Sequence, residues 1–317
     1  MALPASSPSR PDQGAPHVAV LLPVSGAPVR TRGADALLHV AGLAEEHGFD
    51  AVFVGDHLIH PQPMLESLTT LAVVAGHTER IGVEVSVLQL ALRQSAVVAK
   101  QLATLAYLAP GRLAVGIGVG GEHPAEWAAC GVPRLNRGAA TTASARELAA
   151  VLAGEPASFA DGVPHRLDPV PPQPVPLFFG GRREAALRRA AALGAGWVGW
   201  LHSPRGFGAV RSTLRGMRQE AGARASFWYG MQLPVFVSGS RYAQASRRAP
   251  AEAHRPAGSD GYCLEGTAES VLSELRAFWD AGCERFKLSP IDTAHAADQV
   301  QALGRDVLPE VRTWRRD

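Results

Sequence analysis

Several side chains capable of acid-base chemistry stand directly after short apolar runs of the sequence. Asp56 and His57 follow the run Ala51–Gly55. A histidine at the end of a strand can donate a hydrogen bond to a bound ring or transfer a proton near neutral pH. The alternative is a surface histidine beside a helix-capping aspartate. The position favours a catalytic His57, with a lesser role for Asp56 as a contact of a bound group.

A second group lies in the glycine-rich segment GIGVGGEHPAEW. A dinucleotide-binding glycine motif should follow the first strand of a fold, whereas these glycines follow the fourth apolar run. We therefore interpret Gly118 and Gly120 as positions where a flat ring can lie against the backbone. Glu122 and His123 are candidate acid or base groups. Solvent-exposed loop residues are the alternative for both side chains.

A third group is the glycine pair Gly180 and Gly181, which lies between an apolar run and a helical pattern. A glycine turn before a helix exposes backbone N–H groups and the positive end of the helix dipole, with no side chain in the way. Such a turn suits a phosphate. The alternative is that the two glycines only permit a tight connection between strand and helix.

Other chemistries lack the residues that they need. The eleven histidines include no HxxxH or HxH pair supported by nearby carboxylates, so we predict no metal site. No GxSxG motif supplies a serine nucleophile. A reaction that depends on an organic cofactor is therefore the better hypothesis.

Composition limits the partners of the chain. A formal net charge of +2 gives no electrostatic reason to expect nucleic acid or a membrane surface. The three cysteines fit neither a disulfide framework nor a metal knuckle, which indicates a reducing compartment. No apolar run is long enough to span a bilayer, and residues 1–16 lack the hydrophobic segment of a signal peptide. We predict a cytoplasmic protein with a small-molecule substrate and a disordered tail over residues 1–16.

Eight short apolar runs alternate with longer helical patterns through the rest of the chain. The runs are Val18–Leu22, Ala51–Gly55, Ile81–Leu90, Arg112–Gly118, Pro176–Gly180, Trp197–Trp200, Gln232–Val237 and Arg285–Ser289. This alternation predicts a parallel sheet that closes into a (β/α)8 TIM barrel over residues 17–317, with a doubly wound open sheet as the alternative. Long connections predict insertions after the fourth strand, at Gly131–Pro176, and after the seventh, at Gly239–Gly261. In a barrel, the candidate residues meet at the carboxyl ends of the strands.

The sequence resembles the luciferase-like oxidoreductases, the superfamily of bacterial luciferase and the deazaflavin-dependent reductases and dehydrogenases. The resemblance is carried by HGFDAVFVGDHL, by PGRLAVGIGVGGEHPAEW and by PLFFGGRREAALRRAAALGAGWVGW, and it covers nearly the whole chain. It implies a (β/α)8 barrel that binds FMN or the deazaflavin coenzyme F420 at the carboxyl ends of the strands. It also implies that Gly180 and Gly181 bind the cofactor phosphate, with added charge from Arg182 and Arg183.

The resemblance further implies a bulge in the third strand that supports the central ring of the cofactor, often through a non-prolyl cis peptide. Ser86–Val87 is the candidate pair for this bulge. The remaining residues of the predicted cofactor site are Asp56, Gly118, Gly120 and Trp200.

The chain departs from the family at two positions. Bacterial luciferase has an arginine near the flavin phosphate where this sequence has Val119, and the family pattern Gly-Asp-Gly-Trp reads GAGW here, with Ala195 in place of the acid. Val119 and the glycine-rich fourth strand favour F420 over FMN. Lys287 stands in the otherwise apolar last strand. It either faces the barrel interior and pairs with a substrate or cofactor anion, or lies on the helix-facing side with its ammonium extended outward.

Taken with the resemblance, these residues predict an oxidoreductase that uses F420 for hydride transfer to or from a small organic substrate. An FMN-dependent monooxygenase that uses reduced flavin and O₂ is one alternative. A cofactor-free, non-catalytic barrel is another, although the retained His57 and the Gly180–Gly181 turn argue against it. We predict that the segment Gly239–Gly261 is a lid over the substrate. The sequence does not decide whether the protein forms a homodimer.

Overall fold

The structure is a computed structural model that describes residues 14–316, with the exception of residues 32, 121–122, 224 and 247–261. Most of the predicted N-terminal tail, residues 1–13, lies outside the described residues. The same holds for residues 247–261 of the predicted lid.

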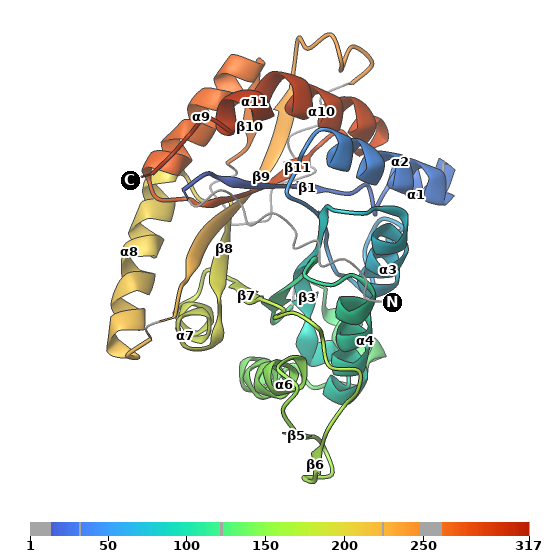
Figure 1. Cartoon of the computed structure of the whole chain (residues 1–317), viewed down its shortest axis with the longest axis vertical. Coiled ribbons are helices and arrows are strands. Elements are labelled where there is room, and N and C mark those ends of the chain that lie inside the picture. The colour runs from blue at the N-terminus through green and yellow to red at the C-terminus, as the bar shows by residue number, and fades with distance from the viewer. Residues whose placement is uncertain (1–13, 32, 121–122, 224, 247–261, 317) are drawn as a thin grey trace, which may run out of the picture.

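In the described part of the chain, eight parallel strands close into a barrel (Figure 1). The barrel strands are β1 (His17–Leu21), β2 (Ala51–Val54), β3 (Gly82–Gln89), β4 (Leu113–Gly118), β7 (Leu177–Gly180), β8 (Gly196–Trp200), β9 (Trp228–Val237) and β11 (Arg285–Pro290). Each strand pairs with the next in this order, and β11 pairs with β1 to complete the ring. The closed ring confirms the predicted (β/α)8 barrel and excludes the open sheet.

Helices surround the strands on the outside of the barrel (Figure 1). They are α1 (Ala27–Thr31), α2 (Gly33–Glu46), α3 (Ser67–His77), α4 (Ser95–Leu108), α5 (Pro124–Ala129), α6 (Arg137–Leu152), α7 (Glu184–Leu193), α8 (Pro204–Glu220), α9 (Ala268–Asp280), α10 (Ala296–Ala302) and α11 (Leu308–Val311). Side-chain caps start several of them: the Ser203 hydroxyl accepts a hydrogen bond from the Gly206 N–H, and the Thr267 hydroxyl accepts one from the Ser270 N–H. None of the helices in the described residues has the length and apolarity needed to cross a membrane.

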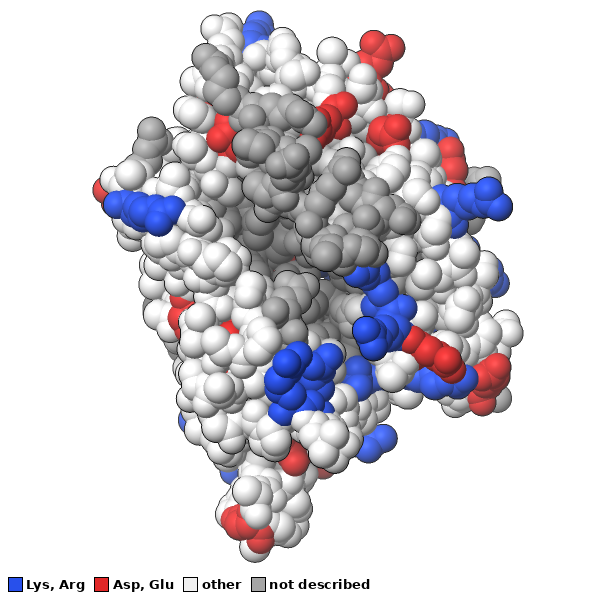
Figure 2. All heavy atoms as spheres, turned by 180° about the vertical axis from the view of Figure 1, so that it is seen from behind, with Lys and Arg blue, Asp and Glu red and all other residues white. Residues whose placement is uncertain are grey.

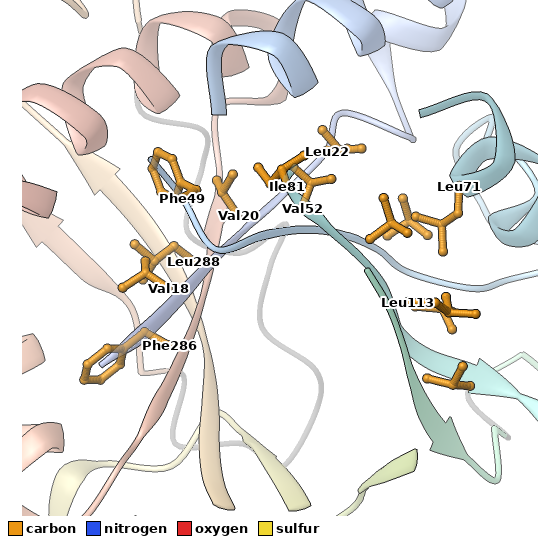
Figure 3. Packing of buried hydrophobic residues seen from close by; sticks show 14 of the residues in the cluster. Val18, Val20, Leu22, Phe49, Val52, Leu71, Ile81, Leu113, Phe286 and Leu288 are labelled. Carbon is orange, nitrogen blue, oxygen red and sulfur yellow. The ribbon is translucent and has the colours of Figure 1, made fainter. Parts of the chain in front are cut away.

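Apolar side chains fill the layer between the strands and the helices (Figure 3). Val18 and Val20 of β1 pack there beside Val52 of β2 and Phe286 of β11, and all four are buried. Successive side chains of a strand point to opposite faces. The alternate residues of the same strands therefore face the inside of the barrel.

The inside of the barrel is narrow, and glycines make room for its large side chains. A Cβ atom at Gly116 of β4 would lie 2.5 Å from the ring of Phe178 on β7. Gly230 similarly lies close to the ring of Trp228. Gly230 also explains one error of the sequence prediction: it interrupts the apolar pattern, so β9 was expected to begin at Gln232, whereas it begins at Trp228.

The structure describes the first predicted insertion and only residues 239–246 of the second. The insertion after β4 contains α5, α6 and a short antiparallel hairpin of β5 (Ala157–Ser158) and β6 (Pro164–His165). The segment after β9 leads to β10 (Leu264–Gly266), which pairs in parallel with the end of β9. These insertions leave the barrel at the carboxyl ends of their strands, next to the candidate residues.

Candidate functional site

Asp56 follows β2 and is only 4% exposed. Its carboxylate accepts hydrogen bonds from the two terminal nitrogens of the Arg93 guanidinium at 2.7 and 2.8 Å. The Ser67 hydroxyl and the Gln89 N–H also donate to it, both at 2.8 Å. The carboxylate therefore ties the end of β2 to the end of β3 and to the start of α3. A contact between Asp56 and a cofactor stays a prediction, because protein donors occupy both carboxylate oxygens.

His57 is held by Glu126 of α5, a carboxylate that the sequence analysis did not single out. Glu126 is fully buried, and its Oε1 lies 3.3 Å from His57 Nδ1. The same oxygen accepts hydrogen bonds from the Leu58 N–H at 2.6 Å and the Ile59 N–H at 3.2 Å. The Gln89 amide nitrogen also lies 3.1 Å from Nδ1. A carboxylate can only accept, so the tautomer that donates from Nδ1 to Glu126 is the one that leaves Nε2 as an acceptor.

The surroundings of Glu126 keep it ionised. Burial alone would raise the pKa of this carboxyl, but the hydrogen bonds from Ile59, Leu58 and the Gln89 amide, together with the nearby His57, lower the pKa below its ordinary value. The only local signal in the sequence is an acidic residue in the first turn of a helix. Its partner His57 lies 69 residues away, so no short motif could have joined the two.

Two more histidines lie beside His57. The ring of His123 is 5.0 Å from that of His57 and nearly perpendicular to it, and the ring of His60 is 5.4 Å away. Two of the three predicted catalytic residues, His57 and His123, are thus brought together from distant parts of the chain. The third, Glu122, lies outside the described residues. Among the residues that the structure does describe, no group of three or more His, Cys, Asp or Glu is arranged to hold a metal ion.

The predicted cis peptide is present between Ser86 and Val87 of β3, where the pairing of β3 with β4 shifts its register. The Ser86 hydroxyl is buried and has no hydrogen-bond partner in the described structure. The Val87 side chain fills the space beside two glycines: a Cβ at Gly118 would lie 2.5 Å from one Val87 methyl carbon, and a Cβ at Gly180 would lie 3.1 Å from the other. The ends of β3, β4 and β7 therefore form a ledge of one valine and two glycines.

The Gly180–Gly181 turn leads from β7 into α7. Gly181 has a φ of +120°, which favours glycine, and a Cβ there would lie 2.7 Å from that of Ala186. The side chains of Arg182 and Arg183 are exposed next to the first turn of α7. In that turn the Ala186 N–H already donates to the Arg183 carbonyl at 2.9 Å, so the N–H groups before it are the ones that could bind an anion. Phosphate binding at this turn stays a prediction. Figure 2 shows several Lys and Arg side chains close together on one face of the molecule.

Two other predicted contacts lie at the same end of the barrel. Gly120 follows β4 with a left-handed φ of +64°, and a side chain there would collide with that of Gln89. Trp200 ends β8 and is half-buried. Their contact with a cofactor stays a prediction, as does that of Gly118.

Lys287 points into the barrel, which excludes the outward orientation considered from the sequence. It is 1% exposed and forms an ion pair with Glu84 of β3. Its ammonium lies 4.7 Å from the centre of the Phe178 ring and 5.0 Å from that of Phe53. Burial lowers the pKa of Lys287, while the negative charge of Glu84 opposes that shift. The partner of Lys287 is thus another protein residue rather than a substrate or cofactor anion.

The comparison with family models agrees with this architecture. Residues 17–255 match the model of the luciferase-like monooxygenases. The chain belongs to this family.

Relatives with similar sequences include proteins that are named for F420. The F420-dependent glucose-6-phosphate dehydrogenase of Beutenbergia cavernae is 37% identical over 179 residues, and that of Nakamurella multipartita is 33% identical over 182 residues. These alignments cover 51% and 52% of this chain, and the same shares of the two relatives. An uncharacterized protein of Mycobacterium tuberculosis is 27% identical over 215 residues, which are 59% of this chain and 73% of the relative.

Solved structures share the fold at lower identity. An F420-dependent secondary alcohol dehydrogenase in complex with an F420-acetone adduct has a TM-score of 0.74 at 21% identity, and covers 94% of this chain and 99% of its own. An EDTA monooxygenase from Chelativorans has a TM-score of 0.76 at 16% identity, with 94% of each chain covered. At these identities, the likeness establishes the barrel fold alone.

Proposed function

We propose that this protein is an F420-dependent oxidoreductase that transfers a hydride to or from a carbon of a small organic substrate. The observation that carries the proposal is His57, held by Glu126 after β2, at the same end of the barrel as the ledge of Val87, Gly118 and Gly180. When a hydride leaves a carbon that bears a hydroxyl, the hydroxyl proton must also leave. His57 Nε2 is the acceptor available for that proton.

The residues at this end of the barrel fit a tricyclic ring with a phosphate tail. The Ser86 hydroxyl is buried and unpartnered, which suits a polar edge of a bound ring. The two glycines of the ledge let the Val87 side chain pack against the backbone of β4 and β7, so that Val87 is the apolar surface on which a flat group can lie. The N–H groups after Gly181 offer a site for the phosphate. When bound there, a deazaflavin supplies the carbon that donates or accepts the hydride.

The residues of this chain have separate roles in the proposed reaction. His57 accepts the substrate proton during oxidation and returns it during reduction. The Glu126 carboxylate stabilises the imidazolium that forms and holds the ring in one orientation, because the backbone of the same loop is bonded to it. The Val87 side chain and the strand ends beside it exclude water from one side of the site.

F420 is preferred to FMN for two reasons. The F420-dependent glucose-6-phosphate dehydrogenases are similar in sequence over about half of the chain. Val119 also replaces the arginine that bacterial luciferase has near the flavin phosphate. An FMN-dependent monooxygenase is the second candidate, since the ledge and the glycine turn fit any tricyclic ring with a phosphate tail.

Equilibrium titrations with F420 and with FMN, followed by fluorescence, test the proposal. We expect F420 to bind at least tenfold more tightly than FMN, a difference of about 1.4 kcal/mol. Tighter binding of FMN would favour the monooxygenase. Binding of neither would favour the cofactor-free barrel and would overturn the proposal.

A further inference from the structure

An ion pair lies inside the barrel, below the proposed cofactor site. Glu84 and Lys287, which we call the inner ion pair, are 3% and 1% exposed. The Lys287 ammonium lies between the rings of Phe53 and Phe178 and donates a hydrogen bond to Glu84. Isolated charges in such a place are costly, so each member depends on the other.

The inner ion pair is one layer below the ledge. Glu84 is two residues before Ser86 on β3, and Phe178, which contacts Lys287, is two residues before Gly180 on β7. Two residues along a strand span about 6.6 Å, and their side chains point to the same face. The ledge and the inner ion pair are therefore about one such step apart along the strands, with Val87 and the Phe178 ring in that layer.

The charges facing Glu84 from the neighbouring strands favour a negative ring above them. His17 of β1 lies 3.9 Å from Glu84, but burial, together with the charges of Arg285, Lys287 and Arg312, lowers the pKa of His17 well below its ordinary value. His17 is therefore neutral at pH 7. The Arg285 guanidinium lies over the Trp228 ring at 4.3 Å, near the start of β11. Lys287 therefore pairs with Glu84 directly, and Arg285 interacts with it electrostatically without forming an ion pair in the described structure.

We infer that the inner ion pair sets the balance between the oxidised and the reduced cofactor on this protein, Lys287 favouring the reduced form and Glu84 opposing it. The inference rests on the proposed function. A hydride carries two electrons and one proton, so its addition makes the ring more negative by one unit of charge. A unit charge about 10 Å away, at an effective dielectric constant of about 20, changes such an equilibrium on the order of tenfold. Glu84 and Lys287 act through this field and do not touch the reacting atoms.

Two single variants test the inference because they must act in opposite directions. The quantity to measure is the dissociation constant of the oxidised cofactor divided by that of the reduced cofactor, for whichever of F420 and FMN binds the wild type. We expect Glu84→Gln to raise this ratio by roughly tenfold and Lys287→Met to lower it by roughly tenfold. For a two-electron couple, tenfold corresponds to about 30 mV in the potential of the bound cofactor.

Two controls separate charge from packing. The double variant Glu84→Gln/Lys287→Met restores electrical neutrality and is expected to return the ratio to within about threefold of wild type. If Lys287→Met alone does not fold, the single variant Glu84→Gln still tests the inference, because it has to raise the ratio. Asp50→Asn removes one carboxylate from an ion pair with Arg312, 2.9 Å long, at the amino end of β2, and should leave the ratio unchanged.

The outcomes distinguish the two proposals. If the wild type binds a cofactor but both single variants shift the ratio in the same direction, or leave it unchanged, the inference is wrong while the proposed function stands. If the wild type binds neither F420 nor FMN, the proposed function fails and the inference fails with it.

Discussion

The ends of β2 and β7 both belong to the proposed site, but they are built in different ways. At the end of β2, side chains carry the chemistry, and partners from distant segments hold them: Arg93 for Asp56, and Glu126 for His57. At the end of β7, the Gly180–Gly181 turn offers backbone groups, and its partners are near in the chain: Ala186 beside Gly181, and the Trp197 indole that donates to the Gly181 carbonyl at 2.9 Å. Side-chain chemistry needs support from the tertiary structure, whereas a phosphate-binding turn needs little beyond glycine and the start of a helix.

The largest effect is expected where the support at β2 is removed. Asp56→Ala leaves the mostly buried Arg93 guanidinium and the Gln89 N–H without their acceptor, and losing one partner of a buried ion pair typically costs about 3–5 kcal/mol. We expect a loss of this size in the free energy of unfolding, measured by chemical denaturation. Asp161→Asn, which removes an exposed carboxylate from a pair with His165, is the control and should change little. A loss below about 1 kcal/mol for Asp56→Ala would show that the end of β2 does not depend on this contact.

The next prediction separates chemistry from support within the same loop. His57→Ala should lower kcat by roughly 10²-fold or more with the substrate that the wild type turns over, because the proton acceptor is lost. His60→Ala is the matched control: its ring lies 5.4 Å from that of His57, but its Nδ1 contacts the backbone of Gln62 rather than a carboxylate. Unchanged turnover in His57→Ala, or an equal loss in both variants, would remove His57 from the mechanism.

The same contrast explains what the sequence could predict. Eight strands and the position of the cis peptide were predictable, because strand periodicity and the family motifs are local signals. The Gly180–Gly181 turn was visible for the same reason. Glu126 was missed, and Lys287 could not be oriented, because their roles depend on His57 and Glu84, which lie 69 and 203 residues away. Closure of the barrel brings such residues together, and no short motif records it.

At the end of β7, a single backbone change should affect binding without affecting chemistry. Gly181→Val introduces a Cβ 2.7 Å from that of Ala186 and blocks approach to the N–H groups. We expect the dissociation constant of the cofactor to rise tenfold or more, at least about 1.4 kcal/mol.

The control for this variant is Gly162→Val in the β5–β6 hairpin. Gly162 also has a positive φ, of +71°, but has open space around it, so the variant places a valine at a left-handed position away from the site. If Gly181→Val folds and binds the cofactor with wild-type affinity, the turn is a structural connection only.

The smallest effect concerns pH and tests whether Glu126 is held as an anion. Its pKa is lowered from the ordinary value of 4.5, so its ionised form adds stability that is fully present above about pH 4.5 and is lost as the pH falls through the folded-state pKa. Glu126→Gln keeps an oxygen for the Leu58 and Ile59 N–H groups but lacks the charge. The wild type should therefore lose its advantage in unfolding free energy over this variant below about pH 4.5, as measured by denaturation at a series of pH values.

The variant Asp50→Asn is a control for which the opposite pH dependence is expected. Burial raises the pKa of Asp50, so acidification should improve the wild type relative to that variant. If both comparisons move in the same direction, Glu126 is not stabilised as an anion by the loop after β2.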